Sequence, residues 1–178
     1  KITDQPLEGW NRIMDVNSTG TFLGVKHAAR LMAQSGGGSI INISSTAGHW
    51  GYPLRSPYVA SKWAVEGMTK TWAMELGRDN IRVNCVAPGT IAGPRMTGVI
   101  EREAAAMDMT ADAVKASYED QVSMRTFIDA SDIAAMATFL CSDAARFING
   151  EIIGVDGNCE TLRTAWPDDH RVDSDIEF

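Results

Sequence analysis

Residues 39–44 read "SIINIS" and residues 81–88 read "IRVNCVAP", and these two apolar runs decide the fold. β-Branched residues follow one another in both runs with little alternation, which is typical of strands buried on both faces of a parallel sheet. A third run, "EIIGVDG", begins at Glu151. Helical patterns with apolar residues every three or four positions precede and separate the runs, over 7–34, 58–76 and 130–143.

The alternation of helices and strands predicts an α/β fold with a parallel sheet and helices on both of its faces. Three strands make a thin sheet, and parallel sheets rarely leave an apolar edge exposed. The chain also begins with Lys1 instead of Met. We therefore expect the chain to be incomplete at this end, with further strands of the sheet preceding Lys1.

The helical patterns make more detailed predictions. The first predicts one continuous helix, whose apolar stripe consists of Ile13, Val16, Gly20, Leu23, His27 and Leu31. The third predicts a helix capped by Ser131, with a stripe of Ile133, Met136, Ala137 and Leu140. The acidic segment rich in Ala and Met that ends near Met124 predicts one or two helices, and Thr110 is a suitable N-cap for one of them.

Composition excludes several classes of protein. The 178 residues carry a net charge of −7, so nucleic acid and anionic membranes are not expected as partners. No apolar run approaches the roughly 18 residues of a transmembrane helix, and no secretory signal is visible. The odd number of cysteines, Cys85, Cys141 and Cys159, has no metal-ligand spacing, which indicates free thiols and a cytoplasmic protein.

Ligands of open α/β sheets bind at the carboxyl ends of the strands, and polar residues gather there. Ser45 follows the first strand, and the Pro88-Gly89 pair ends the second. Tyr58 and Lys62 begin the helix after the first strand, and their i, i+4 spacing places both on one helix face. A nearby ammonium favours the phenolate form of a tyrosine, which then takes a proton from an alcohol or returns one to a carbonyl.

The stretch "NISSTAGHWGYPLRSPYVASKWAVEGMTK", residues 42–70, resembles the active-site segment of the short-chain dehydrogenase/reductase family. The serine-to-tyrosine spacing of that family selects Ser45 over Ser44. The segments "DVNSTGTF", "IRVNCVAPGTI" and "DIAAMATFLCSDAARFINGEIIGVDGN" resemble other segments of the family in the same order. The resemblance implies that residues 1–162 are the C-terminal part of one Rossmann-type, doubly wound domain, followed by a polar acidic tail over 163–178.

The resemblance also implies a catalytic role for four residues. Tyr58 would be the general acid and base, and Lys62 would assist it and hold the nicotinamide ribose. Ser45 would bind the substrate oxygen, and Asn17 would bend its helix and hold a water that connects Lys62 to solvent. A nicotinamide cofactor, NAD or NADP, would pack on Pro88, Gly89 and Ile91.

Two features depart from the family pattern. Gly93 stands where the family usually carries a threonine that helps to hold the cofactor. The chain contains no glycine-rich phosphate-binding turn, which we expect to precede Lys1. The choice between NAD and NADP therefore stays open.

The substrate region is less clearly marked. The residues that would face the substrate are His49, Trp50, Tyr52, Arg55 and Met96. Ordinary surface or packing roles explain each of them about equally well, and an exposed Arg55 is slightly favoured over one that pairs with an acidic substrate. Residues 95–124 would form a lid over the substrate. No metal site is predicted, since the acidic tail residues and His170 are better explained as solvated.

The sequence thus predicts an NAD(P)-dependent oxidoreductase that acts on a secondary alcohol or ketone and forms a homodimer or homotetramer. Two alternatives remain open. The chain is either a truncated, non-catalytic partner that forms dimers, or a family member that uses the same residues for epimerisation or dehydration.

Overall fold

The computed structural model describes residues 1–162, so the predicted tail over 163–178 lies outside the described residues. The helices and strands are α1 (Leu7–Met14), α2 (Gly20–Gln34), β1 (Gly38–Ile43), α3 (Ser56–Leu76), β2 (Ile81–Pro88), α4 (Pro94–Met107), α5 (Ala111–Glu119), α6 (Ala130–Cys141) and β3 (Ile152–Val155). Among these helices, none is both long and apolar enough to cross a membrane.

The three strands form one parallel sheet in the order β1-β2-β3. Ile43 lies opposite Val86, and Pro88 lies opposite Val155, so all three strands end at the same edge of the sheet. The predicted α/β class and parallel sheet are confirmed. Within residues 1–162, the second edge of β1 has no neighbouring strand.

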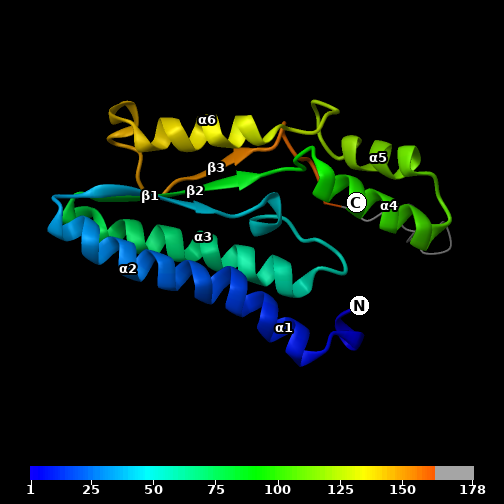
Figure 1. Ribbon diagram of the computed structural model, residues 1–178, viewed down its shortest axis with the longest axis horizontal. Helices are drawn as coiled ribbons and strands as arrows, with labels where there is room; N and C mark the ends of the chain where they lie inside the picture. Colours follow the sequence, from blue (N-terminus) through cyan, green and yellow to red (C-terminus); the bar gives the residue numbers. More distant parts are fainter. Residues whose placement is uncertain (163–178) are drawn as a thin grey trace, which may run out of the picture.

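Helices cover both faces of the sheet. α2 and α3 lie along one face, and α6 lies along the opposite face (Figure 1). On the first face, Val25 and Ala73 pack against Ile81 and Val83, which are fully buried. On the second face, Leu140 packs against Val86. Both faces of the central strand β2 are therefore closed to solvent, which explains why its sequence is almost continuously apolar.

The first predicted helix contains a π-helical segment, Asp15–Thr19, between α1 and α2. A π turn inserts one residue, which rotates everything after it by about 100°. The buried positions of α2 are therefore Val25 and Ala29. The predicted stripe after the π segment was wrong, because its members are exposed among the described residues: Gly20, Leu23, His27 and Leu31.

Two helix caps were predicted, and one was wrong. Thr110 caps α5, and its hydroxyl accepts a hydrogen bond from the Ala113 amide at 3.2 Å. The N-cap of α6 is Asp129, not Ser131. The Asp132 carboxylate accepts from the Asp129 amide at 2.8 Å, which completes a capping box. A carboxylate three residues into the helix therefore decides where α6 begins. Three of the four residues of the predicted α6 stripe are confirmed, since Ile133, Met136 and Leu140 pack in the core.

The segment after β2 forms the two helices α4 and α5, which lie beyond the ends of the strands (Figure 1). Ile100 and Ala104 of α4 pack with Val114 and Tyr118 of α5 in a small core of their own. The two helices are therefore a separate layer beside the edge where the strands end.

The three free cysteines are expected to differ in reactivity. Cys141 is exposed, whereas Cys85 and Cys159 are buried. Burial raises the pKa of Cys85 to about 11. Because the thiolate is the reactive form, Cys85 stays protonated and inert near neutral pH. A disulfide reagent is expected to label Cys141 quickly in the native protein, and all three thiols in denaturant. Fast labelling of Cys85 in the native state, detected by peptide mapping, would contradict this core arrangement.

Candidate active site

Tyr58 and Lys62 lie in the first two turns of α3. Pro57 occupies the first turn of this helix, where its missing N–H costs nothing. Both side chains are half-buried. The Lys62 ammonium lies 5.7 Å from the centre of the Tyr58 ring, so the predicted pairing of these side chains on one helix face is present.

The end of β1 anchors Lys62. Its Nζ donates a hydrogen bond to the Ile43 carbonyl at 3.1 Å, and Ile43 is the last residue of the strand. Burial lowers the pKa of Lys62 from its ordinary value, and the nearby Arg95 acts in the same direction. The ammonium is thus held at a fixed place beside the Tyr58 ring, in partly desolvated surroundings.

Asn17 reaches the same helix from the π-helical segment. Its Nδ2 donates to Ser61 Oγ at 3.0 Å, and Ser61 Oγ donates to the Tyr58 carbonyl at 2.7 Å. Ser61 is fully buried. The Asn17 carbonyl accepts from the Thr21 hydroxyl at 2.7 Å. Asn17 is therefore joined to the backbone turn between Tyr58 and Lys62 and not to the Lys62 side chain itself.

Ser45 lies just beyond the end of β1, where it caps the short helical turn Thr46–Gly48. Its Oγ accepts a hydrogen bond from the Ala47 amide at 3.2 Å. This bond occupies a lone pair and leaves the hydroxyl proton available to donate. Ser45 is half-buried at the same edge of the sheet as the Lys62 anchor.

The Pro88-Gly89 turn is packed directly against β3. A Cβ on Gly89 would come within 2.8 Å of the Asp156 backbone, so this close approach requires glycine. Further along, Ala92 donates to the Ile128 carbonyl, and Ile128 donates to the Thr90 carbonyl. The intervening Ile91 amide makes no hydrogen bond within residues 1–162 and stays free to meet a ligand.

Gly93 has a backbone reason to be glycine. Its φ of +145° lies in a region that other residues rarely adopt, and it precedes α4 directly. Nothing lies within 4 Å of the Cβ that another residue would carry. Thr97, one turn into α4, donates its hydroxyl to the Gly93 carbonyl at 3.2 Å. The residue that departs from the family pattern thus sets the chain direction into α4.

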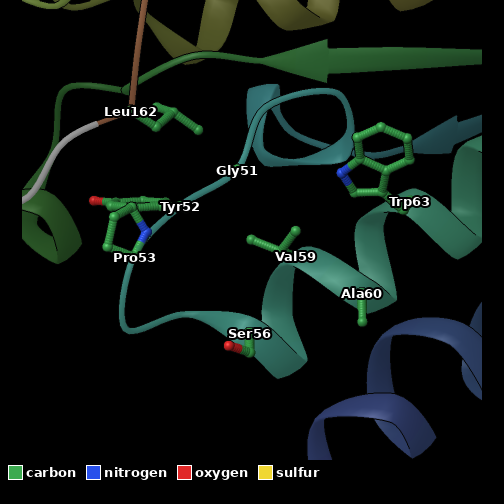
Figure 2. A pocket seen from close by; sticks show the side chains of 8 residues that line it. All are labelled: Gly51, Tyr52, Pro53, Ser56, Val59, Ala60, Trp63 and Leu162. Atoms are coloured by element: carbon green, nitrogen blue, oxygen red, sulfur yellow. The ribbon is translucent and has the colours of Figure 1, made fainter. Parts of the chain in front are cut away.

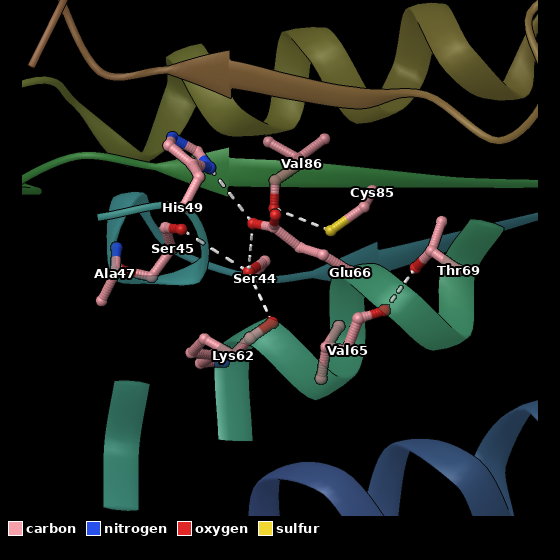
Figure 3. A network of polar contacts seen from close by, with 10 residues as sticks. All are labelled: Ser44, Ser45, Ala47, His49, Lys62, Val65, Glu66, Thr69, Cys85 and Val86. Carbon is pink, nitrogen blue, oxygen red and sulfur yellow. Dashed lines mark hydrogen bonds and ion pairs between the residues drawn. The ribbon is translucent and has the colours of Figure 1, made fainter. Parts of the chain in front are cut away.

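A polar network lies behind the serines, as Figure 3 shows. Glu66 Oε1 accepts from Ser44 Oγ at 2.9 Å and lies 3.3 Å from His49 Nδ1. The Ser44 hydroxyl also lies 3.3 Å from the Lys62 carbonyl. His49, which the sequence suggested as a substrate contact, therefore pairs with Glu66.

A second network joins the loop before α3 to α4 and α5. Glu103 accepts from Arg55 Nη2 at 3.1 Å and from the Tyr118 hydroxyl at 2.8 Å. The Tyr52 hydroxyl lies 3.3 Å from the Tyr118 hydroxyl. Burial raises the pKa of Tyr118 above its ordinary value, so its phenol keeps the proton that it donates. Tyr52 and Arg55 thus bind other parts of the chain.

This network predicts that Glu103 stabilises α4 and α5 against local opening. Glu103→Leu removes the hydrogen bonds that Arg55 and Tyr118 donate to this carboxylate, at a cost of about 1–3 kcal/mol. Backbone amides of α4 and α5 are expected to exchange with deuterium at least about tenfold faster. Glu101→Leu, at an exposed position of the same helix, is the matched control. Equal exchange in the two variants would contradict the role of Glu103.

A cavity beside the first turns of α3 does not contain the candidate catalytic side chains. It has a volume of about 720 Å³ and is lined by Gly51, Tyr52, Pro53, Ser56, Val59, Ala60, Trp63 and Leu162. Figure 2 shows Val59 and Trp63 of α3 and Leu162 of a facing segment around one space. Tyr58 and Lys62 occupy a different face of α3.

Of the other suggested substrate contacts, Trp50 is exposed, and Met96 packs in the core of α4 and α5.

Three residues of these networks were missed in the sequence, Glu66, Glu103 and Tyr118, and Ser44 was considered there only as the alternative to Ser45. Glu66 carried a visible signal, because it follows Tyr58 and Lys62 at the i, i+4, i+8 positions of one helix face. Glu103 and Tyr118 carried none, since their partners lie 48 and 66 residues away in the loop before α3.

The chain matches known proteins along most of its length. A family model described as enoyl-(acyl carrier protein) reductase matches residues 1–158. Trans-4-hydroxycyclohexanecarboxylate dehydrogenase of Sinomonas cyclohexanicum is 38% identical over 156 residues, which are 88% of this chain and 54% of that protein. Dehydrogenase/reductase SDR family member 4 of Mus musculus is 36% identical over 156 residues, 88% of this chain and 53% of that protein.

A solved structure supports the same relationship. The NAD⁺-bound xylitol dehydrogenase superimposes with a TM-score of 0.82 at 29% identity, over 88% of this chain and 62% of that one. The chain therefore spans about half the length of the curated relatives it matches. The agreement of the family model, the relatives and the fold leads to one conclusion: the chain belongs to the short-chain dehydrogenase/reductase family.

Proposed function

We propose that the protein is an NAD(P)-dependent oxidoreductase that interconverts a secondary alcohol and a ketone. One observation carries the proposal. The Lys62 ammonium is fixed between the carbonyl at the end of β1 and the ring of Tyr58, at the edge of the sheet where ligands of such folds bind.

The residues at this edge fit a nicotinamide. Pro88 and Gly89 bring the backbone close to β3 without an intervening side chain, and the free Ile91 amide is a donor for a carboxamide oxygen. Lys62 would donate to the ribose hydroxyls, and Asn17 would support the turn of α3 that carries it. When bound, the cofactor would supply hydride acceptance or donation at its ring.

The side chains of this chain would move the proton. In alcohol oxidation, Tyr58 Oη takes the proton of the substrate hydroxyl, and in ketone reduction it returns that proton to the carbonyl oxygen. The Ser45 hydroxyl, whose proton is not engaged, donates a hydrogen bond to the same oxygen. The Lys62 ammonium, 5.7 Å from the centre of the Tyr58 ring, would assist this proton transfer.

The relatives support this class of substrate. The names of two of them state a hydroxycyclohexane carboxylate and xylitol, both alcohols, as substrates of those proteins. The second was solved with NAD⁺ bound. Residues 95–124, which include all of α4 except Pro94 and all of α5, would serve as the lid over the substrate, since the Glu103 network holds them near the loop that follows Ser45.

A turnover screen tests the proposal. Diols, hydroxy acids, steroids and aromatic alcohols are mixed with the protein and either NAD⁺ or NADP⁺, while the absorbance of reduced nicotinamide is followed. We expect stoichiometric reduction of one cofactor with at least one class of alcohol. Substrate conversion without net cofactor change would instead indicate an epimerase or a dehydratase, and no conversion by any mixture would count against the proposal.

We also propose a cytoplasmic homodimer or homotetramer. α2 and α3 present large apolar side chains to solvent within residues 1–162, among them Phe22, Leu31 and Trp63. Apolar surface left in solvent on two helices favours a contact with another protein chain. Sedimentation velocity is expected to show a species of at least twice the chain mass, and a purely monomeric boundary at micromolar concentration would exclude this surface as the contact.

A further inference from the structure

We propose that Glu66 is a positioning residue, which holds the turn carrying Ser45 against the helix that carries Tyr58 and Lys62. The proposed role rests on the proposed oxidoreductase function. Glu66 lies one helical turn beyond Lys62, and only 12% of its side chain is exposed. A carboxylate in such a place requires hydrogen-bond donors, because burial without them is costly.

Both donors of Glu66 come from the turn that contains Ser45. A carboxylate only accepts hydrogen bonds, so His49 Nδ1 carries the proton that it shares with Glu66 Oε1 at 3.3 Å. Ser44 has one hydroxyl proton, and its shortest contact is with Glu66 Oε1 at 2.9 Å. The charged oxygen therefore takes the Ser44 proton in preference to the Lys62 carbonyl, which lies at 3.3 Å.

These two bonds bracket Ser45 in the sequence. Ser44 precedes Ser45 directly, and His49 follows it by four residues. Between them, the Gly48 amide donates to the Ser45 carbonyl at 2.8 Å, which closes the turn. A single oxygen atom on α3 thus fixes both ends of the turn, and Figure 3 shows the two dashed contacts that meet there.

Gly48 supplies independent support, because the turn is shaped around the carboxylate. A Cβ on Gly48 would overlap Glu66 Oε1 and Ser44 Oγ, although the φ of Gly48 is not in the left-handed region. Backbone strain therefore does not require glycine here, whereas the space taken by Glu66 does.

The consequence for the reaction is geometric. Ser45 and the pair of Tyr58 and Lys62 come from different elements, and no side-chain hydrogen bond among residues 1–162 joins the Ser45 hydroxyl to either of them. Beside the Lys62 contact with Ile43, Glu66 provides a second link between this turn and α3, through Ser44 and His49. A displacement of about 1 Å between reacting groups lowers a rate by about 100-fold, so loss of the link is expected to lower kcat more than it changes the KM for the cofactor.

Four variants test the role of Glu66. Glu66→Ala removes both bonds, and Glu66→Gln keeps an oxygen for Ser44. His49→Ala removes only the hydrogen bond between His49 and Glu66, at a partly exposed site, and introduces no buried charge. It therefore remains informative if Glu66→Ala fails to fold. Glu75→Ala, at an exposed position of the same helix, is the matched control.

Three readouts are measured on the 178-residue protein. Deuterium exchange at the amides of residues 44–49 is expected to accelerate in Glu66→Ala and His49→Ala. The ring nitrogen signals of His49, assigned by their absence in His49→Ala, are expected to show a protonated Nδ1 in the unsubstituted protein and in Glu75→Ala, but not in Glu66→Ala. With an alcohol that the protein turns over, kcat is expected to fall about 100-fold in Glu66→Ala and to recover largely in Glu66→Gln.

Unchanged exchange in folded Glu66→Ala and His49→Ala, together with unchanged His49 ring signals in folded Glu66→Ala, would overturn the proposal. So would an unchanged kcat in Glu66→Ala when the unsubstituted protein is active. If the unsubstituted protein shows no turnover, that result counts against the proposed function alone, and the exchange and ring signals still decide whether Glu66 holds the turn.

Discussion

Replacing Tyr58 with phenylalanine is expected to lower kcat for alcohol oxidation by about 10²–10⁴-fold, the range that a positioned acid or base supplies. The substitution removes only the hydroxyl, while the ring and the nearby Lys62 ammonium stay in place. Tyr58 is half-buried, and its hydroxyl makes no hydrogen bond within residues 1–162, so the folded state loses no internal hydrogen bond. Steady-state kinetics of the purified variant measures the effect.

Two controls separate this outcome from unfolding or loss of cofactor. The urea midpoint and the affinity for reduced cofactor of Tyr58→Phe are expected to match those of the unsubstituted protein. Turnover within tenfold of the unsubstituted protein would rule out Tyr58 as the proton-transfer group.

The largest expected loss of stability comes from Asn84→Leu. Asn84 is fully buried in β2, and it joins this strand to the segment before β3. Its Nδ2 donates to the Ile148 carbonyl at 2.9 Å, and its Oδ1 accepts from the Glu151 amide at 3.0 Å. Leucine fills a similar volume but leaves the Glu151 amide without its partner and the Ile148 carbonyl with only the longer Arg82 contact at 3.3 Å, which costs about 3 kcal/mol.

Urea unfolding followed by circular dichroism measures this loss. The midpoint of Asn84→Leu is expected to fall with little change in slope, since the exposed area on unfolding is similar. Asn11→Leu, at an exposed position of α1, is expected to change stability by less than about 0.5 kcal/mol. Equal midpoints for the two variants would contradict the bridging role of Asn84.

The strands and the parallel sheet could be predicted because the apolar pattern that identifies each strand lies within the strand itself. The continuous β-branched runs of β1 and β2 indicate burial on both faces wherever they lie in the sequence. The buried face of α2 was not predictable in this way. It depends on the extra residue at the π turn, and Asn17 there bonds to Ser61, which lies 44 residues further along the chain.

In the candidate site too, contacts between residues close in sequence could be predicted, whereas contacts between distant residues could not. Tyr58 and Lys62 are neighbours on one helix, so their spacing alone places them together. Arg55 was ambiguous in the sequence, because its partner Glu103 lies on a helix 48 residues away that only the fold brings near. His49 was ambiguous for a similar reason, since the turn after β1 must fold back on α3 before it meets Glu66.

Titration of the 178-residue protein with NADH and NADPH, followed by nicotinamide fluorescence, tests the central claim that this edge of the sheet holds a nicotinamide. We predict a saturable change with at least one cofactor. Lys62→Met is expected to weaken it, and Lys70→Met, at an exposed position of the same helix, to leave it unchanged. A signal that rises linearly without saturation, or equal binding by both variants, would contradict the claim and favour a non-catalytic, dimer-forming partner.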